Sequence, residues 1–211
     1  MANTLTPQAV LERQFGFREF LDGQEAVIRA VLEGTDCLVV LPTGGGKSLC
    51  YQLPAQLVEG LTVVVSPLIA LMKDQVDALT ARGIPAAFIN SSLADGEVGE
   101  RLARMARGEY RLVYIAPERF KSARFIAALA PLSVALFAVD EAHCISQWGH
   151  DFRPDYLRLK HALRELGQPP VIALTATATP EVRDDIVRQL ELGRGGRRRP
   201  RTFVSGFARH N

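Results

Sequence analysis

Short runs of β-branched and other apolar residues alternate along the chain with longer stretches in which apolar residues recur at helical spacing. Most of the short runs are nearly continuous, which is typical of strands buried on both faces of a parallel sheet. They predict seven strands, at residues 37–41, 62–66, 86–89, 111–116, 134–139, 171–175 and 202–205. The stretches between them predict seven helices, at residues 23–32, 47–56, 68–80, 97–106, 119–129, 156–166 and 180–190.

This alternation of strand and helix predicts an α/β protein in which right-handed crossovers connect parallel strands. We expect three layers, with a mostly parallel central sheet between two layers of helices. Ligands of such sheets bind at the carboxyl ends of the strands. The residues that carry the chemistry should therefore lie in the loops that follow the strands.

Composition narrows the class of protein. Apolar residues make up 47% of the chain and charged residues 23%, which is ordinary for a globular protein and excludes a disordered chain. No apolar run approaches the roughly 20 residues of a membrane-spanning helix, and the first residues show no secretion signal. The three cysteines are an odd number at unrelated spacings, which favours a reducing compartment. We expect no membrane partner and a cytoplasmic or otherwise intracellular location.

The net charge of +2 is unevenly distributed. Residues 194–211 contain six arginines and no acid, which leaves 19 basic and 23 acidic residues in 1–193. The body of the protein is therefore not a basic clamp for nucleic acid, and contacts with a phosphate backbone must come from local patches or from this tail. The Arg/Gly-rich segment 194–201 is typical of a solvated linker, with a nucleic-acid arm as the alternative.

The strongest local motif is the loop PTGGGKS at residues 42–48, between a predicted strand and a predicted helix. Its glycines let the backbone turn amide hydrogens toward phosphate oxygens, and the helix N-terminus adds a favourable dipole. The lysine can reach the β and γ phosphates, and the serine hydroxyl can bind Mg²⁺. A glycine turn with a surface lysine is the simpler alternative. The residues expected to bind the nucleotide here are Thr43, Gly44, Gly45, Gly46, Lys47 and Ser48.

Two adjacent carboxylates, Asp140 and Glu141, follow the apolar run at 134–139. Such a pair at a strand end is unfavourable unless a cation or a reactant lies nearby. We expect Asp140 to hold the Mg²⁺ that bridges the β and γ phosphates. Glu141 is the candidate that orients and deprotonates the attacking water.

These motifs resemble the first RecA-like lobe of superfamily 2 helicases, and specifically of the RecQ family of DNA helicases. The resemblance extends over nearly the whole chain. It is carried by PTGGGKS at 42–48, SPLIALMKDQV at 66–76, YIAPER at 114–119, DEAHCISQWGHDFRPDY at 140–156 and ALTATA at 173–178. It implies a RecA-like P-loop NTPase lobe that uses ATP and Mg²⁺ for 3′-to-5′ DNA unwinding in repair and recombination. DNA, as single strands and duplex junctions, is the implied partner.

The resemblance also implies a domain arrangement. Residues 1–193 correspond to the ATP-binding lobe, residues 194–201 to a linker, and residues 202–211 to the start of a second RecA-like lobe. The intact protein is therefore expected to carry that second lobe, and this chain is expected to be a fragment or a truncated product.

Two residues near the start of the chain resemble the family's adenine-binding positions. Phe17 resembles the aromatic residue that stacks on the base, and Gln24 resembles the glutamine that reads its edge. An amide suits adenine because it donates and accepts hydrogen bonds side by side. A core aromatic is the alternative for Phe17. This chain has Leu21-Asp22 where the family shows arginine and proline, so the resemblance does not supply that wall of the pocket.

Ser66 and Pro67 with Lys73, and Arg119 in the later motif, resemble the family's contacts to one DNA strand. Helix N-termini after Ser66 and near Arg119 can donate backbone amides to phosphates. The alternatives are that Ser66 caps a helix and that Lys73 is a solvated charge on it.

The tryptophan loop, residues 145–154, holds the only tryptophan of the chain between glycine and polar residues. Aromatic residues in a polar loop beside a phosphate site suggest stacking on bases, and an arginine there can contact a phosphate. A hydrophobic plug that covers the domain edge is the alternative. The resemblance implies that this loop links DNA binding to hydrolysis. Its candidate DNA-binding residues are Trp148, His150, Phe152 and Arg153.

His143 is a further catalytic candidate. We expect it to bridge the phosphate site and the hydroxyls of Thr175 and Thr177, which can relay the state of the γ-phosphate. With Cys144 and His150 it could be mistaken for a zinc site, but the spacing is not that of paired ligands and no fourth ligand is evident.

Three other functions remain to be weighed against this one. The fragment could bind nucleotide and DNA without appreciable turnover. An RNA helicase of the DEAD-box kind is disfavoured because His143 replaces the final aspartate. A small-molecule P-loop kinase would leave the tryptophan loop and Gln24 unexplained.

Overall fold

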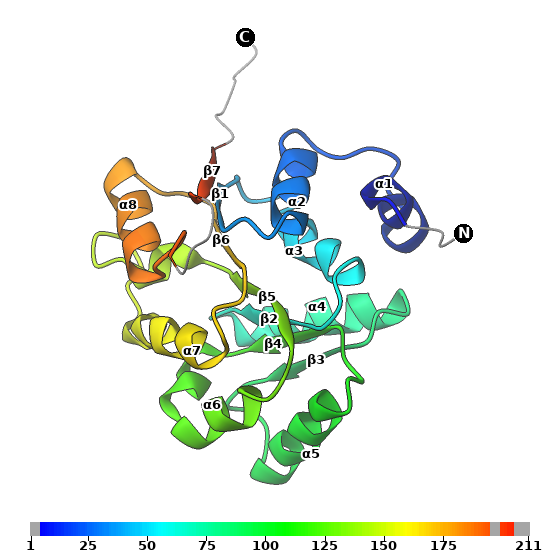
Figure 1. Cartoon of the computed structure of the whole chain (residues 1–211), viewed down its shortest axis with the longest axis vertical. Helices are drawn as coiled ribbons and strands as arrows, with labels where there is room; N and C mark the ends of the chain where they lie inside the picture. Colours follow the sequence, from blue (N-terminus) through cyan, green and yellow to red (C-terminus); the bar gives the residue numbers. More distant parts are fainter. Residues whose placement is uncertain (1–4, 195–198, 205–211) are drawn as a thin grey trace.

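A single parallel sheet of seven strands forms the centre of the molecule (Figure 1). The computed structural model describes residues 5–194 and 199–204. The order across the sheet is β3-β4-β2-β5-β6-β1-β7. The predicted strands are confirmed to within one residue at each described end. They are β1 (Cys37–Val40), β2 (Leu61–Val65), β3 (Ala86–Ile89), β4 (Leu112–Ile115), β5 (Val134–Val139), β6 (Val171–Thr175) and β7 (Arg201–Val204).

Helices occupy each predicted helical stretch, but three of them are divided. Residues 47–56 form α3 and then a 3₁₀ turn that begins at Pro54, whose missing N–H cannot continue the helix. The stretch predicted at 119–129 is divided into a 3₁₀ turn over Pro117–Lys121 and the helix α6. Ser122 separates them and caps α6, because its hydroxyl accepts a hydrogen bond from the Phe125 N–H at 3.2 Å. The stretch predicted at 156–166 begins within a 3₁₀ turn over Pro154–Arg158 and continues as the helix α7. The helices are α2 (Gln24–Leu32), α3 (Leu49–Gln52), α4 (Ile69–Ala81), α5 (Asp95–Ala106), α6 (Ala123–Leu129), α7 (Leu159–Glu165) and α8 (Pro180–Gln189).

The sequence analysis did not predict the first helical segment, α1 (Pro7–Val10), which continues as a π-helical turn over Leu11–Phe15. Val10, Leu11 and Phe15 are buried in the same core as α2. This segment therefore packs on the domain as part of one of its helical layers.

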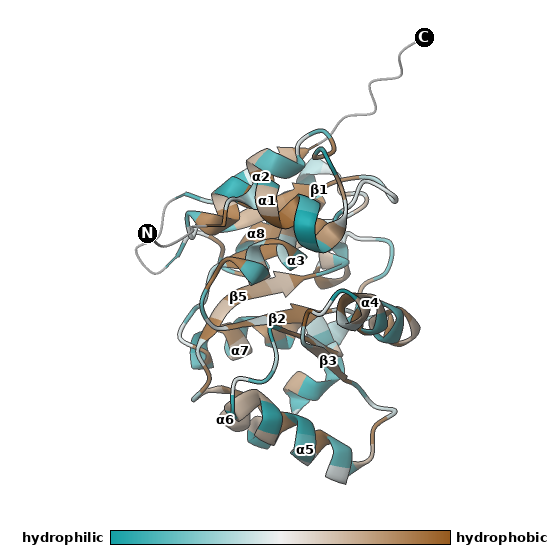
Figure 2. Cartoon of the chain, turned by 90° about the vertical axis from the view of Figure 1, so that its right-hand side faces the viewer, coloured by the Kyte–Doolittle hydropathy of each residue, from teal (hydrophilic) through white to brown (hydrophobic). Residues whose placement is uncertain are grey.

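The helices form two layers around the sheet. Helices α1 to α4 pack against one face, and α5 to α8 pack against the other. Successive residues of β2 point to opposite cores, with Val64 in the first and Val63 and Val65 in the second. Figure 2 shows the strands as a hydrophobic layer between helices whose outer sides are hydrophilic. The three-layer arrangement predicted from the sequence is thus confirmed. Among the described helices, none has the length and apolarity that crossing a bilayer requires.

The sheet order brings the ends of β5, β6 and β1 side by side. Val139 of β5 pairs with Ala173 of β6, and Val40 of β1 pairs with Thr175 of β6. The Leu41 N–H donates to the Thr175 carbonyl oxygen at 3.1 Å, so the pairing continues into the loop after β1. The loops that carry the phosphate motif and the acidic pair therefore flank the end of β6.

A buried carboxylate, Asp36, ties the start of the sheet to the last described elements. Its Oδ1 accepts from the Val171 N–H at 2.9 Å and its Oδ2 from the Gly193 N–H at 2.8 Å. Its backbone oxygen accepts from the Arg201 N–H at 2.9 Å, where β7 begins. Residues 195–198 of the expected linker and 205–211 of the expected lobe-two segment lie outside the described residues.

We expect Asp36→Ala to lower the free energy of unfolding by about 2–4 kcal/mol, because the buried Val171 N–H and the half-buried Gly193 N–H lose their carboxylate acceptor. Urea unfolding followed by circular dichroism measures this change. Asp184→Ala, at an exposed position of α8, is the control and should stay within about 0.5 kcal/mol of the parent. Equal stability of the Asp36 variant and the parent would show that the two N–H groups find other partners.

Candidate active site

The phosphate loop, residues 42–48, connects β1 to α3 with a backbone that requires glycine. Gly44 and Gly46 have φ angles of 82° and 68°, which side chains other than glycine rarely adopt. A Cβ atom on Gly45 would lie 2.9 Å from the Pro42 carbonyl oxygen. The Lys47 ammonium donates to the carbonyl oxygens of Leu41 at 3.1 Å and Pro42 at 3.3 Å. Among the described residues no carboxylate forms an ion pair with it.

Gln24 is 2% exposed and packs against the phosphate loop. Its Oε1 accepts from the Leu21 N–H at 2.8 Å, and its Nε2 donates to the Gly46 carbonyl oxygen at 3.1 Å. Phe17 is 52% exposed, which is unlike a core aromatic, and Leu21 is 54% exposed. The structure thus joins Gln24 to the phosphate loop, while adenine recognition by Gln24 and Phe17 remains a prediction.

The backbone at the end of β5 is fixed on both sides of the acidic pair. The Asp140 N–H donates to the Val65 carbonyl oxygen at 2.8 Å, and the Tyr156 hydroxyl donates to the Asp140 carbonyl oxygen at 2.9 Å. Glu141 adopts φ 48° and ψ 44°, a left-handed conformation that costs a non-glycine residue on the order of 1 kcal/mol. Strain of this kind is retained where surrounding contacts determine the conformation, and it gathers at functional sites.

The two carboxylates have different electrostatic environments. Burial, together with the neighbouring Glu141, raises the pKa of Asp140 to about 6, although Lys47 acts in the opposite direction. A hydrogen bond from His143 lowers the pKa of Glu141. Glu141 is therefore ionised at neutral pH, and the buried Asp140 gains from a cation brought close to it. This donor set, with the Ser48 hydroxyl at the start of α3, fits a hard divalent cation such as Mg²⁺.

His143 connects the acidic pair to the end of β6. Its Nδ1 lies 2.9 Å from Thr175 Oγ1 and 3.3 Å from Glu141 Oε2. The Thr175 hydroxyl donates to the Thr177 carbonyl oxygen at 3.1 Å. The predicted contact of His143 with Thr175 is present, whereas Thr177 is reached only through Thr175 and by its carbonyl oxygen rather than its hydroxyl. Thr175 stands between the acidic pair and the phosphate loop.

The candidate DNA-binding residues after β2 lie at its carboxyl end. Ser66 is buried, and its Oγ accepts a hydrogen bond from the Leu68 N–H at 3.4 Å, so the capping contact proposed as its alternative is present. Pro67 is half-buried beside it. Lys73 is exposed and forms an ion pair with Asp77 one turn later on α4. Their contact with DNA stays a prediction.

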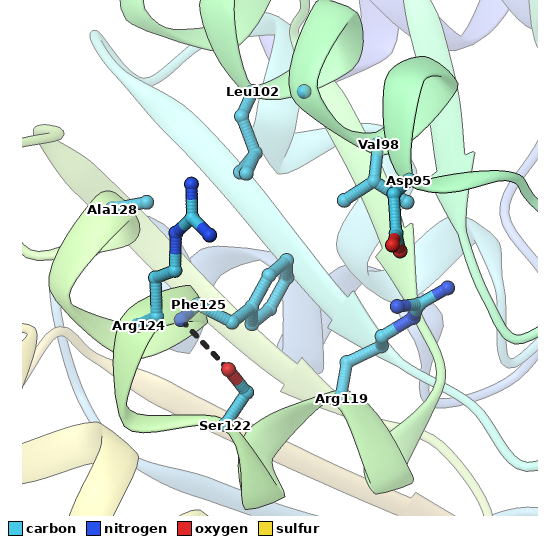
Figure 3. Close-up of a pocket in the computed structure, with 9 residues that line it drawn as sticks. Asp95, Val98, Leu102, Arg119, Ser122, Arg124, Phe125 and Ala128 are labelled. Carbon is cyan, nitrogen blue, oxygen red and sulfur yellow. Dashed lines mark hydrogen bonds between the residues drawn. The ribbon is translucent and has the colours of Figure 1, made fainter.

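Arg119 lies at the neighbouring strand end, after β4, and donates a hydrogen bond to the Asn90 carbonyl oxygen. It also lines a cleft of about 420 Å³ between α5 and α6. Figure 3 shows Arg119 and Arg124 on either side of the Phe125 ring in this cleft. The Arg119 Nε is buried without a partner. A role in binding DNA stays a prediction for Arg119 too.

The tryptophan loop contacts the acidic pair through two stacked rings. The His150 ring lies 4.3 Å from the His143 ring at an interplanar angle of 14°. Trp148 is 77% exposed, which does not fit a hydrophobic plug in this conformation of the loop. Phe152 is half-buried. Arg153 forms an ion pair with Asp151 within the loop, at 2.8 Å.

Sequence reasoning missed two residues that build the site. Tyr156, which holds the Asp140 backbone, was assigned only to the start of a helix. Asp151 lies beside Cys144, with its Oδ2 3.8 Å from the sulfur. Both positions lie in the segment 140–156 that carries the resemblance to RecQ helicases. The sequence does not indicate what either residue contacts, because both contacts depend on how the tryptophan loop folds back.

Comparison with known families matches most of the chain to a helicase family. The pattern of the DEAD/DEAH box helicase family matches residues 22–186. The chain belongs to the DEAD/DEAH box helicase family.

Within that family, the chain is homologous to RecQ helicases over nearly its whole length. It is 53% identical over 208 residues to the ATP-dependent DNA helicase RecQ of Bacillus subtilis, covering 97% of this chain and 34% of that protein. It is 41% identical over 209 residues to the RecQ-like DNA helicase BLM of Xenopus laevis, covering 96% of this chain and 15% of that protein. The chain spans about a third of the length of the bacterial relatives it matches.

Solved structures of helicases share the fold at low sequence identity. The helicase domain of Pyrococcus furiosus Hef superposes with a TM-score of 0.66 at 23% identity, covering 90% of this chain and 39% of that one. The DUF1998 helicase MrfA bound to DNA gives a TM-score of 0.71 at 18% identity, covering 97% of this chain and 28% of that one. The RecA-like lobe predicted from the sequence is thereby confirmed.

We expect Asp140→Asn to raise the free energy of unfolding at pH 7.5 without Mg²⁺ by about 2–3 kcal/mol. The folded protein holds the Asp140 proton up to a pKa of about 6, against 3.8 ordinarily, so ionisation of Asp140 removes stability as pH rises through this interval. Urea unfolding at pH 4 and pH 7.5 measures the difference, which should nearly vanish at pH 4.

Glu141→Gln is the matched control, because the pKa of Glu141 is lowered and its ionisation favours the folded state. The same neutralisation there should bring no gain at pH 7.5. A gain of equal size in both variants would contradict the opposite environments of the two carboxylates.

Proposed function

We propose that this chain is the ATP-binding lobe of a RecQ-like DNA helicase, which couples ATP hydrolysis to 3′-to-5′ movement along single-stranded DNA and to duplex unwinding. The observation that carries the proposal is the meeting of the phosphate loop and the acidic pair on either side of Thr175. Homology to proteins named ATP-dependent DNA helicases supports DNA as the partner.

The residues of the phosphate loop bind and orient the nucleotide in this proposal. Lys47 moves its donors from the carbonyl oxygens of Leu41 and Pro42 to the phosphates, which are stronger acceptors. The amides of residues 43–48 surround the phosphates, and Gln24 and Phe17 hold the base. Ser48 and Asp140 would hold Mg²⁺, which when bound neutralises charge on the β and γ phosphates.

Glu141 orients the attacking water and accepts its proton. The low pKa that His143 gives it keeps it ionised and ready to accept a hydrogen bond at neutral pH. His143 positions Glu141 from one side and contacts Thr175 from the other, so it can pass the state of the γ-phosphate to β6. This arrangement supports the proposal that His143, Glu141, Lys47 and Asp140 form the catalytic group.

The proposed DNA contacts come from the carboxyl ends of β2 and β4 and from the tryptophan loop. Ser66, Pro67, Lys73 and Arg119 would hold the backbone of one strand. The exposed indole of Trp148 would stack on a base, with His150, Phe152 and Arg153 beside it. A second RecA-like lobe would close on this one, and the greater length of the relatives supports that expectation. An intracellular location follows from DNA as the substrate.

Nothing in the comparisons favours a lobe without turnover, an RNA helicase or a small-molecule kinase over this function. The contact of His143 with Glu141 and Thr175 gives the histidine a specific place beside the acidic pair. The tryptophan loop, which a kinase leaves unexplained, touches that same histidine through His150.

We expect Lys47→Ala and Glu141→Gln to separate binding from hydrolysis. Lys47→Ala should remove most ATP affinity, because no other cation of the loop can take its place. Glu141→Gln should keep Mg-ATP binding and lower DNA-stimulated hydrolysis by ~10²-fold or more. Calorimetry measures binding, and steady-state phosphate release from the protein joined to its second lobe measures hydrolysis. Unchanged ATP affinity in Lys47→Ala would refute the proposal that the phosphate loop binds the nucleotide.

We expect Trp148→Ala to weaken binding of single-stranded DNA by about 10-fold or more, the scale of one lost base-stacking contact. ATP affinity should stay that of the parent, because the indole lies outside the phosphate loop. Fluorescence anisotropy of a labelled oligonucleotide measures DNA binding, and Trp148→Phe, which keeps an aromatic face, is the control. Equal DNA affinity of the alanine variant and the parent would contradict stacking.

A further inference from the structure

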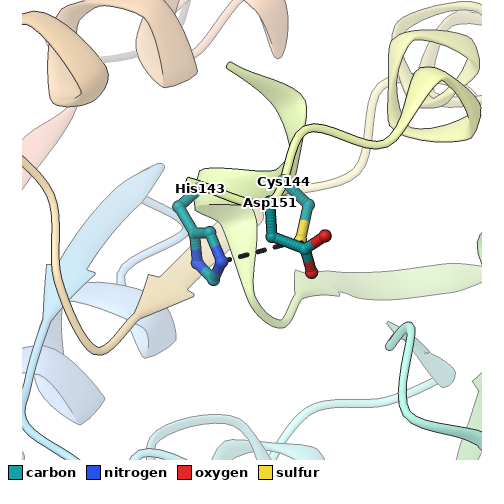
Figure 4. Close-up of side chains that lie close together, drawn as sticks. All are labelled: His143, Cys144 and Asp151. Atoms are coloured by element: carbon teal, nitrogen blue, oxygen red, sulfur yellow. Dashed lines mark hydrogen bonds between the residues drawn. The ribbon is translucent and has the colours of Figure 1, made fainter. Parts of the chain in front are cut away.

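Three side chains that commonly ligate metals meet beside the acidic pair (Figure 4). One donor atom from each of His143, Cys144 and Asp151 lies within 4.8 Å of the other two. Cys144 Sγ is 3.7 Å from His143 Nε2 and 3.8 Å from Asp151 Oδ2. His143 and Cys144 are buried, and Asp151 is exposed, which leaves the cluster open to solvent on one side.

The hydrogen bonds of His143 leave its Nε2 free to bind a cation. The Thr175 hydroxyl donates its only hydrogen to the Thr177 carbonyl oxygen. It can therefore only accept a hydrogen bond from His143 Nδ1. The other neighbour of Nδ1 is the Glu141 carboxylate, which is also an acceptor. The proton of a neutral His143 therefore sits on Nδ1, and the lone pair of Nε2 faces the Cys144 sulfur.

This arrangement already has the outer partners of a zinc-binding histidine. Histidine ligands usually donate their second N–H to a carboxylate or another oxygen, which fixes the ring and raises its basicity. Here the Glu141 carboxylate and the Thr175 hydroxyl are the oxygen partners of His143 Nδ1. A structural zinc site usually has four protein ligands, whereas three protein ligands leave a fourth position for water.

The distances require only small movements for two of the donor pairs. Zinc bonds of 2.0–2.3 Å in tetrahedral geometry separate neighbouring donors by roughly 3.4–3.6 Å. The N–S and S–O separations are 3.7 Å and 3.8 Å. Arg153 now donates to Asp151 Oδ2 at 2.8 Å and 3.1 Å. This is the same oxygen that lies near the Cys144 sulfur, so the Arg153 side chain, which is 40% exposed, must move to Oδ1 to leave Oδ2 to the cation.

We propose that His143, Cys144 and Asp151 form a site for a thiophilic divalent cation such as Zn²⁺, which joins the tryptophan loop to the turn that follows Glu141. Binding exchanges the thiol proton of Cys144, which leaves to the solvent, for a metal–thiolate bond. The bound cation would hold Asp151, and with it the tryptophan loop, at a fixed distance from His143. The site is distinct from the Mg²⁺ site proposed at Ser48 and Asp140, which offers only oxygen donors and lacks the thiolate and imidazole that select Zn²⁺.

The test uses Co²⁺ as a spectroscopic probe on the whole chain of 211 residues. The parent should show a thiolate-to-cobalt absorption band in the near ultraviolet at one equivalent, and Zn²⁺ should remove it by competition. Cys144→Ser should abolish the band. Asp151→Asn should weaken Co²⁺ binding by more than the roughly 10- to 100-fold that changes to outer partners cost.

Two controls keep the assignment specific. Cys37→Ser changes a buried thiol that lies outside the cluster and should keep the band and the affinity of the parent. Trp148 fluorescence provides a second readout, because it should change when Zn²⁺ fixes the loop in the parent and stay constant in Cys144→Ser. Absence of the band in the parent, or its persistence in Cys144→Ser, would overturn the proposal. Either result leaves the ATPase proposal unaffected, since that is tested by Lys47→Ala and Glu141→Gln.

Discussion

A parallel sheet covered by helices on both faces can present charged groups to a ligand only at the ends of its strands. Every residue of β1, β2, β4 and β6 is buried, so these strands have no solvent-facing side on which a polar side chain could lie. The polar chemistry is therefore concentrated in the loops that follow them. The order β5-β6-β1 then decides which loops meet, and it places Thr175 between Glu141 and the phosphate loop.

The site is built at a cost to the stability of the fold. Asp140 is a carboxylate whose burial disfavours its charged form, and Glu141 holds a left-handed backbone. Both features would be removed by selection for stability alone. The surrounding hydrogen bonds from Tyr156 and to Val65 hold the backbone in place, so the strain is carried by a rigid frame. A cation bound near Asp140 would stabilise its ionised form and so raise the free energy of unfolding.

The positions of the strands could be predicted from the sequence because their apolar runs are continuous and short. The sequence also placed residues 42–48 and the pair Asp140–Glu141 at strand ends, where the structure has them on either side of Thr175, while their chemical roles stay predictions. Helix divisions were harder, because a local breaker such as Pro54 or a cap such as Ser122 interrupts an otherwise helical pattern. Contacts between distant residues left no pattern at all. Asp36 and Val171 are 135 positions apart, and nothing in either neighbourhood indicates that they meet.

The two nitrogens of His143 face different parts of the molecule. Nδ1 faces Glu141 and Thr175, and Nε2 faces Cys144 and, beyond it, Asp151 of the tryptophan loop. An imidazole ring is rigid, so a change in the partner of one nitrogen alters the orientation of the other and which of the two carries the proton of the neutral ring. The stacked ring of His150 makes the position of His143 depend on the loop as well. A movement of the tryptophan loop can therefore reach the carboxylate of Glu141 through one side chain, without any rearrangement of the sheet that carries it.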